Sequence, residues 1–174
     1  MATFIARAMA GSDAAVPFDG SVPGEGPYSC TTGGTSLFDD VAPTASYCRH
    51  VHYVYAREVT AGCGATTYCP GSRVTRAQMA MFIARAMAGS DAAVPADYTD
   101  PVTARHYDCG GAPPTLYFTD VAAGALYCRH AHYLWARAVV DGCGATTYCP
   151  SGIVNRAAMA KFLTNGFGLV LYGP

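Results

Sequence analysis

The chain has 174 residues, of which 51% are hydrophobic and 13% charged, so the composition is that of a globular protein and not of a disordered one. The formal net charge is −1 and the lysines and arginines are scattered, which argues against binding to nucleic acid or to an acidic membrane. No apolar run in the sequence approaches the length that spans a bilayer.

The sequence repeats itself. The residues FIARAMAGSDAAVP occur at Phe4–Pro17 and again at Phe82–Pro95, and GCGATTYCP occurs at Gly62–Pro70 and at Gly142–Pro150. Self-similarity at a long fixed period predicts an array of supersecondary units. Because the first residues recur inside the chain, we interpret them as part of a unit and not as a secretory signal. We therefore expect the chain to be the C-terminal part of a longer protein.

The first copy predicts two helices around a connection. Residues 1–10 carry apolar positions at helical spacing, whereas residues 11–37 are rich in Gly, Pro, Ser and Thr and predict an irregular connection. A second helix is predicted over 47–59, with Gly62 expected to stop it. The next element opens at a predicted capping box, in which the side chains of Thr75 and Gln78 cap each other's backbone N–H groups.

The second copy keeps the same order. An irregular connection over 89–117 precedes a helix over 127–139, which Gly142 is expected to stop, and Asn155 caps the last helix. We therefore expect a mainly α fold: tandem helix–loop–helix repeats with long irregular, disulfide-tied connecting loops.

Eight cysteines fall as four per copy, and this even, matched spacing predicts disulfides and an oxidising, extracellular setting. Three pairings are possible within each copy. We favour Cys63–Cys69 and Cys143–Cys149, because Gly64 and a short polar loop lie between the first pair. That leaves Cys30–Cys48 and Cys109–Cys128, which would attach each long loop to the following helix.

A zinc site is the alternative use of these cysteines. Cysteine and histidine suit zinc, and Cys30 could complete a set of four ligands. Against this, oxidised cysteines cannot ligate a metal, and two histidines that are two residues apart project about 200° apart on a helix. We favour disulfides and expect no metal and no cofactor. The residues of the alternative are Cys48, His50 and His52, with Cys128, His130 and His132 as their copies.

The sequence offers no catalytic constellation. A thiol nucleophile needs a free, activated sulfur, and Asp39, Asp40 and Asp120 lack a partner carboxylate at a spacing suited to acid–base chemistry. We therefore expect no enzymatic activity. Asp13 and Asp91, each in Gly-Ser-Asp, are expected to cap turns and not to bind calcium.

The order of these landmarks resembles the S-layer homology (SLH) family, in particular the cysteine-containing C-terminal repeats of secreted bacterial proteins. That family shows Phe-x-Asp-Val, an amphipathic helix, a Gly turn, an aromatic-x-Pro loop end and a Thr-Arg-Ala-Glu box. The first copy here has Phe38, Asp40, Val41, Gly62, Tyr68, Pro70 and the box at 75–78; the second has Phe118, Asp120, Val121, Gly142, Tyr148, Pro150 and the box at 155–158.

The resemblance implies three segments. Residues 1–17 would be the second helix and tail of a preceding SLH-type repeat, residues 18–95 one repeat with its Cys loop, and residues 96–174 the last repeat. The terminal run Phe162–Pro174 resembles the natural C-terminal end of such proteins.

The resemblance also implies a non-enzymatic extracellular module that anchors to cell-wall polysaccharide or builds a surface assembly. In the family, the arginine of the box helps to hold an acidic group of the polysaccharide. Arg76 and Arg156 match that arginine, with Thr75 and Gln78 beside the first of them.

The alternative function is self-assembly. The chain would then be a subunit of an extracellular filament or surface layer, in which a neighbouring chain completes the N-terminal half-repeat. The expected partners are therefore cell-wall polysaccharide or copies of the chain itself, with no nucleic acid and no insertion into a membrane.

Overall fold

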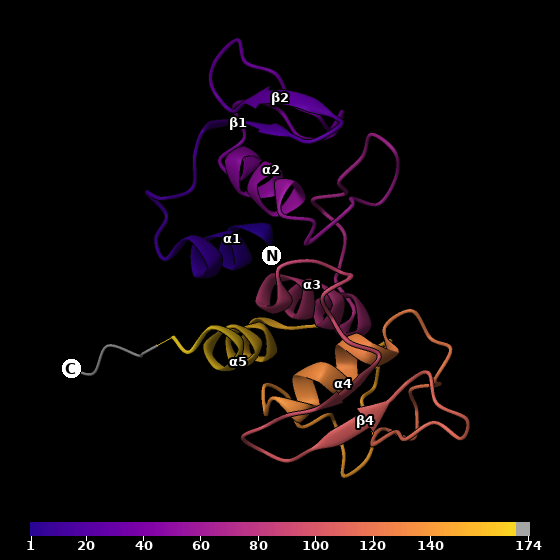
Figure 1. Ribbon diagram of the computed structural model, residues 1–174. Helices are drawn as coiled ribbons and strands as arrows, with labels where there is room; N and C mark the ends of the chain where they lie inside the picture. Colours follow the sequence, from indigo (N-terminus) through magenta and orange to yellow (C-terminus); the bar gives the residue numbers. More distant parts are fainter. Residues whose placement is uncertain (170–174) are drawn as a thin grey trace, which may run out of the picture. The chain divides into compact units, whose positions relative to one another are not determined.

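The computed structural model describes residues 1–169. The chain forms two compact units, an N-terminal unit over Met1–Ser72 and a C-terminal unit that begins at Arg73. In the described residues the elements are α1 (Ala2–Ala10), β1 (Asp19–Val22), β2 (Gly26–Ser29), α2 (Cys48–Ala56), α3 (Arg76–Ala88), β3 (Asp97–Thr99), β4 (His106–Asp108), α4 (Cys128–Ala136) and α5 (Arg156–Phe167) (Figure 1).

The expectation of a mainly helical fold is wrong. Only 31% of the residues are helical, and the long connections that we expected to be irregular contain antiparallel hairpins. In one hairpin Gly20 pairs with Tyr28, and in the other Tyr98 pairs with Tyr107. These strands are three or four residues long and lack the alternation of polar and apolar residues that identifies a strand in a sequence.

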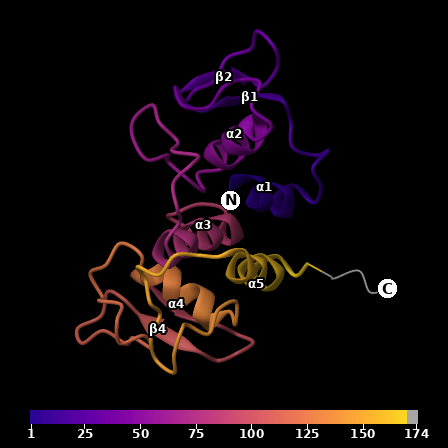
Figure 2. The ribbon, with the colours of Figure 1, turned by 180° about the vertical axis from the view of Figure 1, so that it is seen from behind.

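In the N-terminal unit, α1 packs against α2 and the β1–β2 hairpin lies beside α2, as both views of the ribbon show (Figures 1 and 2). Tyr28 of β2 is buried and stacks on His52 of α2, with the ring centroids 4.5 Å apart. Phe38 contacts the same imidazole ring from the segment before α2. Each hairpin strand contributes few buried side chains, so packing on α2 stabilises the hairpin.

The C-terminal unit follows the same plan and adds a helix. α3 packs against α4 and α5, and the β3–β4 hairpin lies beside α4. The capping box of Thr75 and Gln78 on α3 is confirmed, as is the Asn155 cap of α5. Tyr107 of β4 takes the place of Tyr28 and is buried against His132.

Gly62 and Gly142 do not end the helices that precede them. α2 ends at Ala56 and α4 at Ala136, several residues earlier than predicted. Gly62 instead has φ +79°, and a Cβ added there would lie 2.5 Å from the carbonyl oxygen of Thr67. The glycine is therefore needed for the tight closure of the cystine loop.

The compact units divide the chain at a different place from the predicted repeats. Each unit pairs the second helix of one predicted repeat with the first helix of the next, as α1 with α2 and α3 with α4. The division into 1–17, 18–95 and 96–174 therefore stays a prediction about sequence units. Residues 170–174 of the predicted C-terminal end lie outside the described residues.

All eight cysteines form disulfides, in the pairs that the sequence favoured. Cys30–Cys48 ties the residue after β2 to the first residue of α2, and Cys109–Cys128 ties the residue after β4 to the first residue of α4. These two bonds fix each hairpin to its helix, whereas Cys63–Cys69 and Cys143–Cys149 close short loops.

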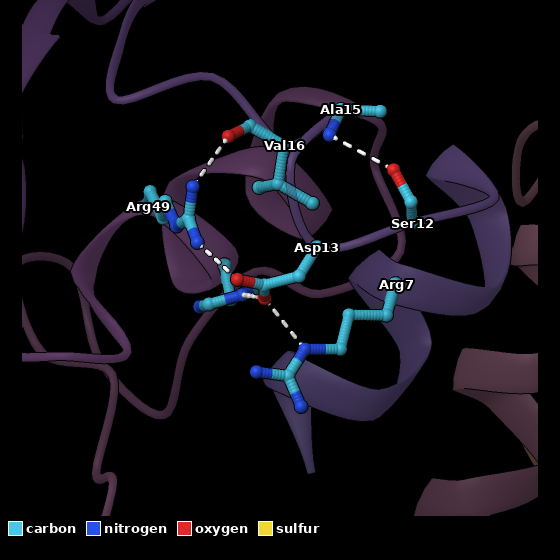
Figure 3. Close-up of polar contacts among 7 residues, drawn as sticks. Arg7, Ser12, Asp13, Ala15, Val16 and Arg49 are labelled. Carbon is cyan, nitrogen blue, oxygen red and sulfur yellow. Dashed lines mark hydrogen bonds and ion pairs between the residues drawn. The ribbon is translucent and has the colours of Figure 1, made fainter.

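A carboxylate holds each helix pair together. Asp13, just after α1, accepts hydrogen bonds from Arg7 of α1 and from Arg49 and His50 of α2, and Figure 3 shows the two arginines converging on it. The hydrogen bonds from Arg7 and then His50 lower the pKa of Asp13 to about 2. The role that we predicted for Asp13, capping of a turn, belongs to Ser12, whose hydroxyl accepts from the Ala15 N–H.

Asp91 repeats this arrangement between α3 and α4. It accepts from Arg85 Nε at 2.6 Å and from His130 Nε2 at 2.9 Å, and it also contacts Arg129. Burial works against ionisation of Asp91, but the hydrogen bonds from Arg85 and His130 outweigh it and lower the pKa of the carboxyl group. Ser90 caps the turn here, as Ser12 does in the first copy.

Substitution of Asp91 by alanine is expected to lower the free energy of unfolding by about 1–2 kcal/mol, because it removes several charged hydrogen bonds at a partly exposed position. A suitable control is Asp97→Ala, which removes an Asp–His pair with 68% and 44% of the side chains exposed. The control should change stability by less than about 0.5 kcal/mol. Urea unfolding measures both, and equal effects would contradict the role of Asp91.

Candidate functional site

Arg76 begins α3 and is held from several sides. Its Nε donates to the carbonyl oxygen of Tyr148 at 2.7 Å, and its guanidinium carbon lies 4.8 Å from the centroid of the Tyr148 ring. Phe162 of α5 contacts the guanidinium group from another side, at 5.8 Å. Nη2 is buried and has no hydrogen-bond partner within residues 1–169. The side chain is therefore fixed in place and keeps unused donor capacity.

A small hollow lies beside this guanidinium group. Its volume is about 50 Å³, and across it Lys161 of α5 forms an exposed ion pair with Asp141 at 2.7 Å. Pockets that enclose small molecules measure roughly 300–1,000 Å³, so this hollow has room for a single small group and not for a sugar ring. The lining residues are Arg76, Val140, Asp141, Gly142, Ala158, Lys161 and Phe162.

The cystine loop of the second copy docks on the same end of α3. The N–H of Arg76 donates to the carbonyl oxygen of Gly152 at 2.8 Å, and that of Ala77 to Pro150 at 2.9 Å. The hydroxyl of Tyr148 donates back to the carbonyl oxygen of Arg76 at 2.9 Å. Two backbone donors at the start of α3 are thereby occupied, so any anion bound here depends on the guanidinium group.

The other predicted ligand residues lie elsewhere in this unit. Thr75 and Gln78 are engaged with each other: Gln78 Oε1 accepts from the Thr75 N–H at 2.9 Å, and Thr75 Oγ1 accepts from the Gln78 N–H at 3.3 Å. Arg156 begins α5, is exposed, and makes no hydrogen bond or ion pair with the described part of the chain. Of the four residues, only Arg76 lines the hollow.

The sequence analysis missed the residues that hold the loops. The carboxylate of Asp120 accepts from the N–H groups of Tyr148 and Cys149, each at 2.7 Å. Asp40 does the same for Tyr68 and Cys69, at 2.8 and 2.7 Å. The signal was the matched spacing of 28 residues between each aspartate and its tyrosine, which also recurs in both copies.

The candidate metal clusters are structural. Sγ of Cys30, Sγ of Cys48 and a ring nitrogen of His52 lie within 4.8 Å of one another, but the two sulfurs form a disulfide. His52 Nδ1 lies 2.9 Å from the carbonyl oxygen of Cys48, and Nε2 accepts from the Leu37 N–H at 3.0 Å. Both ring nitrogens are therefore used by the backbone, and the oxidised cluster does not fit a metal.

The second cluster has the same chemistry. Cys109 and Cys128 form a disulfide, and His132 joins the carbonyl oxygen of Cys128 to the N–H groups of Tyr117 and Phe118. His130 points instead to Asp91, as His50 does to Asp13. The two histidines of each copy thus serve different contacts, which is consistent with their opposite directions on the helix.

Burial lowers the pKa of His52 and His132 below the usual value, although the hydrogen bond to a backbone carbonyl oxygen works in the opposite direction. Burial also lowers the pKa of His130, against the raising influence of Asp91. Each imidazole therefore stays neutral in the folded protein at a pH where the unfolded chain already binds a proton.

The free energy of unfolding is expected to fall as the pH drops through about 6.5, because the unfolded chain gains protons that the folded chain excludes, by at most about 1.4 kcal/mol per pH unit for each histidine. Urea unfolding between neutral and mildly acidic pH measures this slope. The variant His106→Gln, which alters an exposed histidine, should keep the slope. A stability that does not change over this range would contradict the prediction.

Residues 37–80 match the family model of the S-layer homology domain. This segment of the chain is similar to the S-layer homology domain. The matched segment contains the landmarks of the first copy, from Phe38 through the cystine loop to the capping box on α3. No curated protein and no solved structure matches the chain.

S-layer homology domains are non-catalytic binding modules of cell surfaces, and residues 37–80 are similar to them. Among the described residues, no helix is both long enough and apolar enough to cross a membrane.

Proposed function

We propose that this chain is a non-enzymatic extracellular module that anchors a protein to cell-wall polysaccharide. The observation that carries the proposal is the S-layer homology match over residues 37–80. The four disulfides support an oxidising, extracellular setting.

The anchoring contact that we propose is between arginine and an acidic group of the polysaccharide. Arg76 supports this, because it lines a hollow with room for one small group and its buried Nη2 lacks a partner among the described residues. A carboxylate matches the fork of donors on a guanidinium group. Lys161 lines the same hollow but is paired there with Asp141, so the positive charge comes from Arg76, while the exposed Arg156 would supply a second cationic contact.

Combined substitution of Arg76 and Arg156 by alanine is expected to weaken binding to purified, acidic cell-wall polysaccharide at least tenfold, since each charged hydrogen bond contributes about 1.5–3 kcal/mol. Co-sedimentation of the protein with the polysaccharide measures this. The control is Arg57→Ala with Arg73→Ala, which removes two exposed arginines outside the hollow.

Thermal unfolding of the variants must accompany this measurement, because Arg76 also supports the Tyr148 loop. The variant Arg76→Lys keeps the charge and loses the planar fork, so it separates attraction by charge from bidentate recognition. A folded double variant that binds the polysaccharide as the wild type does would contradict the arginine contact.

A second candidate function is self-assembly into an extracellular filament or surface layer, and one observation favours it. Phe4 of α1 has 45% of its surface exposed, although the same sequence in α3 places Phe82 in a less exposed position. A contact with another chain would remove this apolar surface from water. Electron microscopy of the concentrated protein should show regular polymers, whereas a protein that stays monomeric would contradict self-assembly.

A further inference from the structure

The loop that docks on α3 occurs a second time in the chain. Residues 62–70 are identical to residues 142–150 at all nine positions. The two loops also fold alike: the N–H of Cys63 donates to the carbonyl oxygen of Thr67 at 2.8 Å, and that of Cys143 to Thr147 at 2.8 Å. The loop at 62–70 therefore carries the same docking surface.

Among the described residues, the loop at 142–150 docks on the start of a helix in its own unit, and the loop at 62–70 does not. Tyr148 is fully buried, and its hydroxyl and ring contact Arg76. Tyr68 packs on Phe38 but is partly exposed, and within its own unit, Met1–Ser72, no arginine covers its ring and its hydroxyl makes no hydrogen bond. The loop at 62–70 thus presents a tyrosine whose counterpart is a central contact elsewhere.

The matching receptor also occurs a second time. Residues 154–157 read Val-Asn-Arg-Ala where residues 74–77 read Val-Thr-Arg-Ala, and both begin a helix. At α3 the arginine side chain and the first two backbone N–H groups hold the loop. At α5, Arg156 is exposed and the N–H groups of Arg156 and Ala157 have no partner in the described part of the chain.

We propose that the loop at 62–72 of one copy docks on the N-terminal end of α5 of a second copy. Arg156 would cover the ring of Tyr68 and donate to its carbonyl oxygen, and the N–H groups of Arg156 and Ala157 would donate to the carbonyl oxygens of Ser72 and Pro70. The contact between α3 and residues 142–152 is the template. The inference rests on the self-assembly candidate, whose interface it specifies.

The residues that follow the two loops differ at two positions, and the proposed contact must accommodate both differences. Ser72 replaces Gly152, where an added Cβ would lie 3.3 Å from Cδ of Arg76, a flexible methylene that can shift by a few tenths of an ångström. The backbone at the two positions agrees, since the N–H of Ser72 donates to Cys69 at 3.0 Å as that of Gly152 does to Cys149. Arg73 replaces Ile153, whose bridge to Thr75 is formed by the backbone.

The contact uses different surfaces on the two partners, so each copy offers one loop and one receptor. Such a heterologous interface leaves an unused surface at each end of a dimer, and further copies add head to tail. The product is a closed ring or an open filament. The loop at 62–70 is the proposed partner of α5 because its sequence is identical to that of the loop that docks on α3.

Complementation between single variants tests this arrangement. Arg156→Ala destroys the receptor and keeps the loop, whereas Tyr68→Ala destroys the loop surface and keeps the receptor. Each variant alone should be monomeric at concentrations where the wild type polymerises, and a 1:1 mixture should stop at a dimer with one intact interface. Sedimentation velocity distinguishes monomer, dimer and polymer, and Arg57→Ala is the control for loss of an exposed arginine.

Tyr68→Phe is a second test in case Tyr68→Ala fails to fold, because the phenyl ring preserves the packing on Phe38. It removes only the hydroxyl that would donate to the backbone carbonyl oxygen of Arg156, as that of Tyr148 does to Arg76, so association should weaken about tenfold, as expected for one hydrogen bond.

The outcomes separate the interface from the candidate function on which it rests. A wild type that stays monomeric overturns both. A wild type that polymerises while folded Arg156→Ala polymerises equally well overturns the interface and leaves self-assembly standing. A mixture that polymerises beyond the dimer, or that remains monomeric, also overturns the proposed pairing.

Discussion

The helix pairs of this protein depend on a carboxylate that two arginines and a histidine share. Asp91 draws Arg85 from α3 and Arg129 and His130 from α4 to one point, and Asp13 does the same between α1 and α2. Without the carboxylate, positive groups from both helices would face each other across a partly buried space. The approach of the two helices sets the position of the hairpin and of the loops that follow.

The disulfides and the buried imidazoles then fix the hairpins and the irregular segments to these helices. A hairpin of three-residue strands does not stabilise itself in water. Here Cys109–Cys128 fixes it to α4, Tyr107 packs beside His132, and that histidine binds the backbone before the helix through Nε2. Cystine and histidine therefore act together as a structural site, which accounts for their metal-like arrangement.

The two proposed functions place different demands on the box arginines. Arg76 is committed to the Tyr148 loop through Nε and its ring contact, and only the rest of its guanidinium group is left for a ligand. Among the described residues nothing occupies the guanidinium group of Arg156, which could serve either an acidic polysaccharide or a tyrosine loop of another copy. A copy that uses Arg156 for assembly cannot offer the same group to the polysaccharide, so the two uses compete at α5.

The sequence by itself determined the features that short-range chemistry controls. The capping box of Thr75 and Gln78 could be read from residues near one another. The internal repeat and the SLH landmarks at residues 37–80 could be read by matching residue order alone, without knowing any contact. Only the tertiary structure decided the hairpins, the helix ends and the roles of Asp91 and Asp120. The physical reason is that these features depend on partners 28 to 39 residues away or on packing against another element. An aspartate followed by a distant histidine or backbone N–H leaves no helical or strand periodicity, only a spacing that recurs in both copies, and a strand with one buried residue has no alternation to detect.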